Sequence, residues 1–235
     1  VPLRTLLALT HVSQKWRTIA IGYPILWTHT DCHDRAQFIA FMQRSQELPI
    51  SLVVHHDDII FSGYRQALSA VSFMEVITPI TSRLRTLKVT FTRVNGELPD
   101  WLVTAVPGLQ LDYLLLTVDA TDVWRSPHHG NTKALFAEQV SRVKALRLDG
   151  VAGWELSTRF PNLTHLLFSG AKFRTVDRIA DLLSYIPSLE VLSFNRVSPP
   201  GAIQQRSSRK VSLQRLRTVS FSDSEAAALQ LIDDL

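Results

Sequence analysis

Three short segments rich in histidine hold the residues that could bind a metal ion or activate a nucleophile. His55–Asp58 offers four potential ligands, Cys32–Asp34 places a thiol beside an imidazole, and His128–Gly130 adds two more histidines. Neighbouring residues of a strand point to opposite faces, and a nucleophile usually meets its base across the fold rather than along the chain. We therefore predict that these segments are polar links and loops, with no metal site and no cofactor.

Other sequence signals of an enzyme are also missing. The sequence contains no phosphate-binding loop, no dinucleotide-binding glycine pattern and no Gly-x-Ser-x-Gly turn. The paired acids Asp57-Asp58 and Asp233-Asp234 are interpreted as solvated residues. We therefore predict a protein without catalytic residues. An enzyme that uses the histidine loops stays an alternative, which bound metal and the combined replacement of His55 and His56 would test.

The composition predicts a globular protein of a reducing compartment. The chain has 235 residues, 46% of them hydrophobic, which is enough for one elongated domain or for a small unit and a larger one. Its single cysteine, Cys32, excludes an internal disulfide. No apolar run approaches the roughly 20 residues that span a bilayer. We expect a cytoplasmic or nuclear protein that does not bind membranes, and we expect the sequence to be part of a longer chain.

Charge is distributed unevenly, although the net charge is only +4. Residues 191–222 contain six arginines and lysines and no acidic residue. This segment is either a solvated basic loop beside a strand or a docking patch for an acidic or phosphorylated partner. Nucleic-acid binding is not predicted, because the basic residues are not interleaved with aromatic ones.

A short apolar motif recurs in the second part of the chain. It consists of an apolar residue, two variable residues, an apolar residue, one variable residue and a further apolar residue. The six copies are Leu84-Leu87-Val89, Leu111-Leu114-Leu116, Val143-Leu146-Leu148, Leu163-Leu166-Phe168, Leu189-Leu192-Phe194 and Leu216-Val219-Phe221. Successive copies begin 20 to 32 residues apart, which is the length of an irregular leucine-rich repeat.

Helices are expected between these copies. The candidates are residues 65–78, 99–106, 132–140 and 176–186, and an earlier helix at 35–46 precedes a strand at 50–54. Repeated strand and helix units stack parallel strands on one side and helices on the other. We therefore predict an α/β fold, an irregular leucine-rich-repeat solenoid. The asparagine of regular repeats is absent from all six copies, so we expect uneven curvature and long loops at 118–131 and 198–212.

The first 31 residues are dense in apolar side chains. Leu6, Leu9, Val12 and Trp16 recur at three- and four-residue steps, which favours a pair of helices with one apolar stripe. Ser13 can cap the second helix, and the later Gly22 and Pro24 can end it. A unit of this size cannot bury its stripe alone, so we expect it to dock on the following domain, on another protein, or on both.

This segment resembles a known family. Leu6-Leu7-Ala8-Leu9, then Val12-Ser13-x-x-Trp16-Arg17-x-x-Ala20 and Pro24-x-Leu26-Trp27 are similar to the second half of an F-box of the fungal, basidiomycete type. The resemblance continues through Arg44-Ser45 and Pro49-Ile50-Ser51-Leu52 to about Val54. It implies a partial F-box at 1–31, with its second and third helices, and a leucine-rich-repeat-like solenoid at 32–235 that is incomplete at its carboxyl end. The first F-box helix, which usually begins with Leu-Pro, is not in this sequence.

The resemblance implies a substrate-recognition subunit of a Skp-cullin-F-box ubiquitin ligase. In that family the box binds a Skp-type adaptor, the repeats hold the target protein, and other subunits transfer ubiquitin. The positions that match box residues packing the box or facing the adaptor are Leu6, Leu9, Val12, Trp16 and Trp27. Because the first box helix is absent, we expect weak or no adaptor binding by this chain alone. The alternative function is a leucine-rich-repeat interaction scaffold without a ligase role.

The repeat also predicts which residues bind the target. The apolar positions of each strand point to the core, so the variable positions between them point to the concave face. The predicted target-binding residues are Lys88, Tyr113, Leu115, Arg147, His165, Leu167 and Val191. An apolar centre with a polar rim is typical of a protein-recognition surface. The alternative is that another part of the protein covers this face. Trp101, Trp124 and Trp154 are predicted to fill the core.

Overall fold

The structure is a computed structural model that describes residues 3–31, 35–55, 74, 77–91, 100–118, 135–138, 140–150, 158–170, 176–196 and 211–222. In these residues the chain forms one sheet of eight strands whose spatial order follows their order in the sequence. Every neighbouring pair of strands is parallel, so each connection must cross from the end of one strand back to the start of the next. The predicted α/β architecture with parallel strands is confirmed, and it is compatible with a solenoid-like arrangement.

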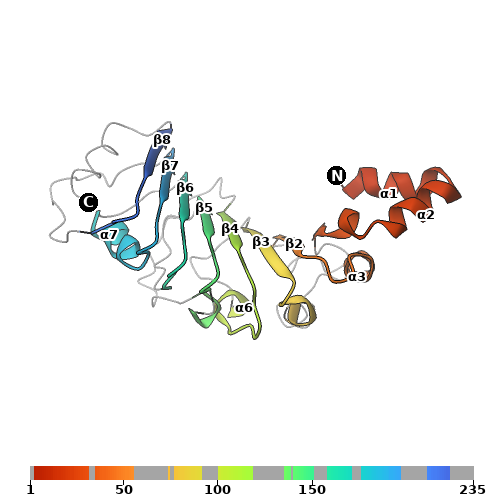
Figure 1. Ribbon diagram of the computed structural model, residues 1–235, viewed down its shortest axis with the longest axis horizontal. Helices are drawn as coiled ribbons and strands as arrows, with labels where there is room; N and C mark the ends of the chain where they lie inside the picture. The colour runs from red at the N-terminus through yellow and green to blue at the C-terminus, as the bar shows by residue number, and fades with distance from the viewer. Residues whose placement is uncertain are drawn as a thin grey trace.

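The strands lie side by side and point in one direction (Figure 1). Their bounds are β1 (His29–Asp31), β2 (Ile50–His55), β3 (Leu84–Phe91), β4 (Tyr113–Val118), β5 (Ala145–Asp149), β6 (His165–Ser169), β7 (Val191–Asn195) and β8 (Thr218–Ser222). Among the described strands, β1 and β8 form the two edges, because each pairs with one neighbour.

Helices lie on one face of the sheet and beyond its β1 edge. Their bounds are α1 (Leu3–Val12), α2 (Gln14–Gly22), η1 (Pro24–Trp27), α3 (Arg35–Arg44), η2 (Thr78–Ile80), α6 (Asp100–Val103), η3 (Leu135–Glu138) and α7 (Val176–Ser184). α6 and α7 lie on the same side of the sheet, whereas α1 and α2 project past the β1 edge (Figure 1). No helix in the described segments has the length and apolar character needed to cross a bilayer.

The apolar residues of the six sequence motifs form in-register columns on the helix-covered face. One column runs from Leu87 through Leu114, Leu146 and Leu166 to Leu192, each at most 1% exposed. At the carboxyl end of the sheet, Phe168, Phe194 and Phe221 stack with ring centroids 5.5 and 5.3 Å apart. Because identical positions lie side by side, each motif buries its apolar residues against those of its neighbours.

Glycine or a left-handed residue follows three successive strands. Gly150, Gly170 and Arg196 come directly after β5, β6 and β7, with φ of 67°, 61° and 51°. Their amides donate hydrogen bonds to the last carbonyl oxygens of the next strands, Ser169, Asn195 and Ser222, at 2.7, 2.9 and 2.9 Å. This backbone ladder closes the carboxyl ends of the strands. The positions where regular repeats carry asparagine lie outside the described residues, as do most of the two predicted long loops.

Several predicted elements differ from the structure. β1 was not expected, because His29-Thr30-Asp31 lacks an apolar pattern; it joins the sheet through parallel pairing with β2. Residues 132–140 were predicted to be helical, but the described part is only the short turn η3, in which Phe136 and Ala137 have φ of 48° and 47°. There the Leu135 amide donates to the buried Thr158 hydroxyl oxygen at 2.7 Å, which ties the start of the segment to a residue distant in sequence.

The remaining helix predictions agree with the structure in type and approximate position. The helix expected at 35–46 is α3, the one at 99–106 is the shorter α6, and the one at 176–186 is α7. The strand predicted at 50–54 is β2, one residue longer. Most of the predicted helix at 65–78 lies outside the described residues.

Candidate protein-binding surfaces

A small core separate from that of the sheet holds the amino-terminal helices together. It consists of Leu6, Ala20, Trp27 and Phe41, all at most 3% exposed. The Trp27 indole donates a hydrogen bond from Nε1 to the Ala20 carbonyl oxygen at 2.9 Å and meets the Phe41 ring edge to face, with centroids 4.9 Å apart. The Arg44 guanidinium lies 4.3 Å from the Trp27 ring centroid. The Trp27 side chain, three residues after Pro24, therefore fills the space between α2 and α3 and connects the two helices.

The sequence explains the local structure of these helices. The Ser13 hydroxyl oxygen accepts a hydrogen bond from the Trp16 amide at 3.2 Å, which caps α2 as predicted. The Arg17 Nε donates to the Thr10 carbonyl oxygen at 2.8 Å, across the junction of α1 and α2. The two helices are thus fixed relative to each other by polar contacts as well as by the small core.

Exposed apolar side chains are concentrated in this amino-terminal part. Eight large hydrophobic residues are exposed among the described residues, and six of them lie between residues 12 and 25. We call these six the amino-terminal apolar surface: Val12, Trp16, Ile19, Ile21, Tyr23 and Ile25. Such a concentration is typical of a surface that binds another protein, because single exposed apolar residues are normally scattered.

The structure separates the five residues predicted to serve the adaptor into two groups. Val12 and Trp16 are 66% and 49% exposed, so both are accessible to a partner. Leu6 and Trp27 are at most 1% exposed and pack the small core, so neither offers side-chain surface to a partner. Leu9 is half-buried. The sequence stripe did not indicate Ile21, Tyr23 or Ile25, which extend the accessible apolar surface.

The second surface is the face of the sheet opposite the helices, which we call the open face. Because side chains alternate along a strand, its residues are those between the buried apolar ones, and parallel pairing arranges them in rows. The first row is His29, Ser51, Thr86, Tyr113, Ala145, His165, Val191 and Thr218. The second row is Asp31, Val53, Lys88, Leu115, Arg147, Leu167, Ser193 and Ser220.

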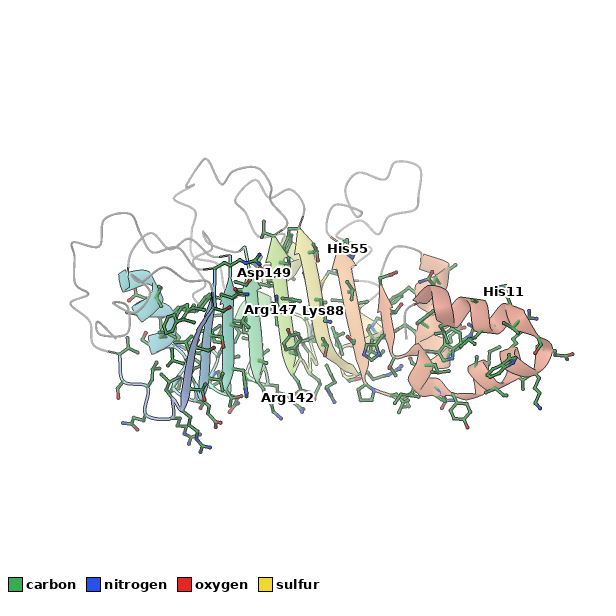
Figure 2. The ribbon with its side chains drawn as sticks, turned by 90° about the horizontal axis from the view of Figure 1, so that it is seen from above. His11, His55, Lys88, Arg142, Arg147 and Asp149 are labelled. Carbon is green, nitrogen blue, oxygen red and sulfur yellow. The ribbon has the colours of Figure 1, made fainter. Side chains whose placement is uncertain are left out.

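All seven residues predicted to bind a target lie in these two rows. Lys88, Leu115, Arg147 and Leu167 are consecutive in the second row, and the other three lie in the first. The labelled Lys88 and Arg147 lie in the middle of the sheet (Figure 2). Except for the exposed His165, these residues are half-buried, because their neighbours in the rows cover part of each side chain. The seven therefore form one continuous surface.

The charged residues of the open face have unequal partners. The Arg147 Nη2 donates to the Asp149 Oδ2 at 3.2 Å, one step along the same face of β5. The Arg147 Nε is buried and has no hydrogen-bond partner among the residues that the structure describes. Lys88 makes no hydrogen bond or ion pair with any described residue. The sequence indicated that both cations lie on this face but not that only one of them is paired.

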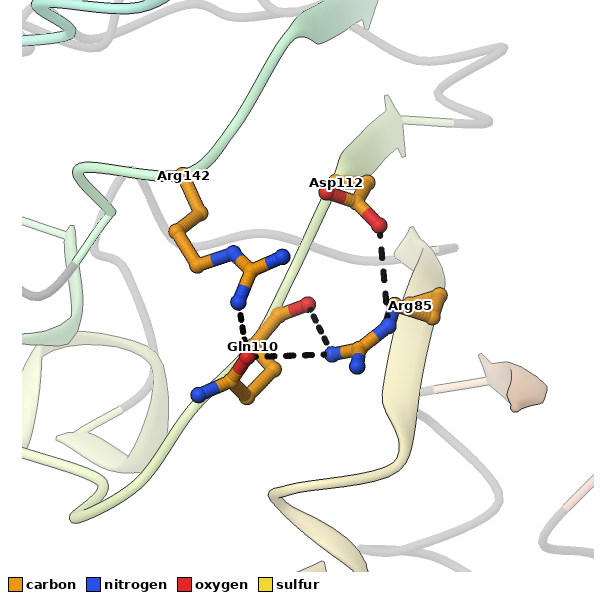
Figure 3. A network of polar contacts seen from close by, with 4 residues as sticks. All are labelled: Arg85, Gln110, Asp112 and Arg142. Carbon is orange, nitrogen blue, oxygen red and sulfur yellow. Dashed lines mark hydrogen bonds and ion pairs between the residues drawn. The ribbon is translucent and has the colours of Figure 1, made fainter. Parts of the chain in front are cut away.

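A polar network that the sequence did not predict joins the amino ends of β3, β4 and β5 (Figure 3). The Arg85 Nη1 donates to the Gln110 carbonyl oxygen at 2.8 Å, and its Nε lies 3.7 Å from the Asp112 Oδ2. The Arg142 Nη1 donates to the Gln110 Oε1. These contacts span three strands, so we interpret the network as a connection between strands rather than as a binding site, although the buried Asp112 Oδ1 has no hydrogen-bond partner among the described residues.

A second connection lies where α3 ends. The Arg83 guanidinium donates to the Leu48 carbonyl oxygen at 3.1 Å and to the Ser45 hydroxyl at 2.7 Å. Ser45 itself is fully buried. Arg83 thereby fixes the turn between α3 and β2 to the start of β3, which holds the helical part against the sheet.

The histidine segments provide little described chemistry. His55 is the last residue of β2, whereas His56, the acids after it, Cys32–Asp34 and His128–Gly130 lie outside the described residues. Within the part of the chain that the structure describes, no three potential ligands gather around a possible metal position. Trp101 packs in the core with 2% exposure, and Trp124 and Trp154 lie outside the described residues.

Comparison with known proteins assigns no family to the chain. The comparisons found no matching family model, no matching curated protein and no matching solved structure. Function is therefore argued from the amino-terminal apolar surface, from the open face and from the sequence resemblance.

Proposed function

We propose that the chain is a substrate-recognition subunit of a Skp-cullin-F-box ubiquitin ligase. In this proposal the amino-terminal apolar surface contacts a Skp-type adaptor, which links the chain to a cullin, and the open face binds the target protein. The chain has no catalytic role, since other subunits transfer ubiquitin. Its proposed location is the cytoplasm or nucleus.

The observation that carries the proposal is the concentration of exposed apolar residues at one end of the molecule. Val12 and Trp16 are 66% and 49% exposed. They lie on helices that pack around their own small core, and Ser13 caps α2. An exposed tryptophan on an ordered helix is a typical anchor of a protein interface, because it buries a large area with little loss of conformational entropy. These are also two of the positions that resemble the F-box.

The arrangement of the two surfaces supports the same proposal. The helices that carry the amino-terminal apolar surface project past the β1 edge (Figure 1), whereas the open-face residues Lys88 and Arg147 lie in the middle of the sheet (Figure 2). A partner on α1 and α2 would leave the open face accessible. Two separate surfaces are what a subunit requires if it is to hold an adaptor and a target at the same time.

A binding measurement with a purified Skp-type adaptor tests the proposal. The adaptor is immobilised for biolayer interferometry and the full chain is titrated over it. We expect weak but saturable binding, with a dissociation constant of about 10 μM or higher, as for small interfaces. Trp16→Ser should weaken it by about tenfold or more, because truncating a central tryptophan anchor commonly has an effect of this size.

Ile39→Ser is the matched control for the same measurement. Ile39 is another exposed apolar residue, at 44%, but it lies on α3 outside the amino-terminal apolar surface. We expect its replacement to leave adaptor binding unchanged. If both variants bind like the wild-type chain, the ligase proposal fails. The alternative function, an interaction scaffold without a ligase role, would then be favoured. No detectable binding would agree with the absence of the first box helix from this sequence, and retention of cullin by tagged chain in cells then decides. The same alternative would be favoured if tagged chain expressed in cells did not retain cullin.

A further inference from the structure

The centre of the open face combines two cations with an apolar residue between them. Lys88 of β3, Leu115 of β4 and Arg147 of β5 are directly paired neighbours in the second row. Neighbouring strands lie about 4.8 Å apart, so the two cationic side chains rise from positions about 10 Å apart on either side of Leu115. Long side chains at this spacing can both reach a group placed above the leucine.

Arg147 has unused hydrogen-bonding capacity. Its Nη2 donates to Asp149 and its side chain is 41% exposed, so part of the guanidinium is accessible to a ligand. Its Nε is buried without an acceptor among the described residues and reaches one only if the side chain rotates. A buried donor without a partner is unfavourable, and an acceptor that reaches it regains that free energy. Because a guanidinium offers parallel donors to a carboxylate, the group that fits this side chain is an anionic oxygen.

The charge balance around this position favours an anion with a single charge. Lys88 and Arg147 contribute +2 and Asp149 contributes −1, so the local sum is +1. Among the described residues in the rows of the open face, the other acid is Asp31, which lies two strands from Lys88, about 10 Å away, where screening is substantial at physiological salt. A carboxylate matches the sum of +1 better than a phosphate, which carries close to two charges.

Apolar side chains border the same position. Leu115 separates the cations, Leu167 follows Arg147 in the row, and Tyr113 lies beside Leu115 on the same strand face. All three are half-buried, so each keeps accessible apolar surface. A ligand on this face would therefore gain from burying an apolar side chain next to its anionic group.

We propose that the open face over β3–β6 binds a protein segment in which an aspartate or glutamate lies next to a bulky apolar residue. The carboxylate accepts hydrogen bonds from Lys88 and Arg147, and the apolar side chain packs on Leu115, Tyr113 and Leu167. This inference rests on the proposed function, because it names the class of target segment that the receptor would hold.

Selection from a random peptide library tests this specificity. The full chain is immobilised and panned against phage-displayed random nonapeptides. We expect enrichment of sequences with aspartate or glutamate adjacent to leucine, isoleucine or phenylalanine. The most enriched peptide is then synthesised with a fluorescein label, and its affinity is measured by fluorescence anisotropy together with versions that carry glutamine or phosphoserine in place of the acid.

Variants of the two cations locate the binding position. Lys88→Gln and Arg147→Gln should each weaken peptide binding by about tenfold or more, because each removes a charged hydrogen-bond donor from the carboxylate. Arg159→Gln is the matched control, since Arg159 is exposed in the turn before β6 and has no described partner. Thermal unfolding of each variant checks that the fold is kept. Lys88→Gln alone suffices if the loss of Arg147 unfolds the chain, because Lys88 has no partner to lose.

Four outcomes would overturn the inference. These are no enriched peptide, enrichment without acids, equal binding by the Lys88→Gln variant, and tighter binding of the phosphoserine peptide than of the glutamate peptide. Failure of the ligase proposal is seen separately, because the adaptor is proposed to bind the amino-terminal apolar surface. Trp16→Ser is therefore expected to leave peptide binding intact.

Discussion

The amino-terminal helices and the sheet use apolar residues in opposite ways. In the sheet, each motif buries its leucines and phenylalanines against those of the neighbouring strands, so the core is continuous from β2 to β7. In the helical part four of the described residues form the buried core, and six large apolar residues remain exposed. The sheet is thus stabilised from within, whereas much of the apolar surface of α1 and α2 is free to stabilise a complex.

The helix α3 joins these two regions. Phe38 belongs to the core of the sheet, Phe41 belongs to the small core, and Met42 packs against both. Three residues of one helix therefore contact two cores. Loss of the small core is expected to release α1 and α2 while α3 is still held by Phe38.

The largest effect that tests this comparison is expected for Trp27→Ala. The change removes a fully buried ring that contacts Phe41 and bonds the Ala20 carbonyl, so the small core should lose about 3–5 kcal/mol. Because that core has few other members, we expect α1 and α2 to unfold while the sheet stays folded. Amide hydrogen exchange should show lost protection in residues 3–22 and unchanged protection in β3–β7.

Leu116→Ala is the matching change in the sheet. Leu116 is fully buried in the centre of β4, and its truncation is expected to cost about 2–5 kcal/mol. We expect this change to lower the free energy of unfolding of the whole sheet, which urea unfolding measures. If Trp27→Ala lowered protection equally in the helices and the sheet, the two regions would form one cooperative unit and the comparison would be wrong.

An intermediate effect is expected for Gly150→Ala, which tests how tightly the strand ends fit. A Cβ at Gly150 would lie 2.5 Å from the Val118 carbonyl oxygen, and φ there is +67°. We expect a loss of about 2–3 kcal/mol from left-handed strain and this clash. Gly170→Ala has φ of +61° but no atom closer than 3.7 Å, so the loss should be only about 1 kcal/mol. Equal losses of unfolding free energy for the two variants, measured by urea unfolding, would contradict the close approach at Gly150.

The smallest effect is expected for Arg44→Gln at the junction of the two regions. The guanidinium lies 4.3 Å from the Trp27 ring centroid, and a cation at such a position contributes about 0.5–1 kcal/mol. We expect a slight rise in hydrogen exchange of α1 and α2 and no change in the sheet. Lys15→Gln removes an exposed cation of α2 without a ring contact and serves as the control. A similar rise in hydrogen exchange in both variants would show that the loss of a positive charge, and not the loss of the ring contact, causes the effect.

The sequence predicted most of the sheet because register follows from the repeated motif. Each copy places its apolar residues at the same spacing, so pairing Leu114 with Leu146 also pairs Leu116 with Leu148. β1 was not predictable in this way, since a polar three-residue strand has no apolar period and forms only because the chain after Trp27 lies beside β2. The described residues 135–138 do not form the predicted α-helix, and there the Leu135 amide donates a tertiary hydrogen bond to the Thr158 hydroxyl oxygen, a contact that the local sequence does not indicate.

The residues of the candidate surfaces could be predicted only where a periodic pattern of apolar residues identifies them. Alternation along the strands identified all seven open-face residues, because the four in the second row each lie between two buried positions and the three in the first row each lie directly before a buried one. It could not indicate that Arg147 pairs with Asp149 while Lys88 stays unpaired, since side-chain rotamers decide this. In the helices, the apolar stripe did not distinguish the buried Leu6 from the exposed Val12 and Trp16, because the positions of Phe41 and Trp27 in space determine which part of the stripe is covered.

The matching order of strands in space and in sequence has a mechanical consequence. Force applied to the two ends of the described sheet would act first on β1 or β8, each of which is hydrogen-bonded to one described neighbour. Once an outer strand detaches, the next one becomes the edge and experiences the same load. The sheet is therefore expected to extend in successive steps of one strand and its connection, and not to rupture all at once.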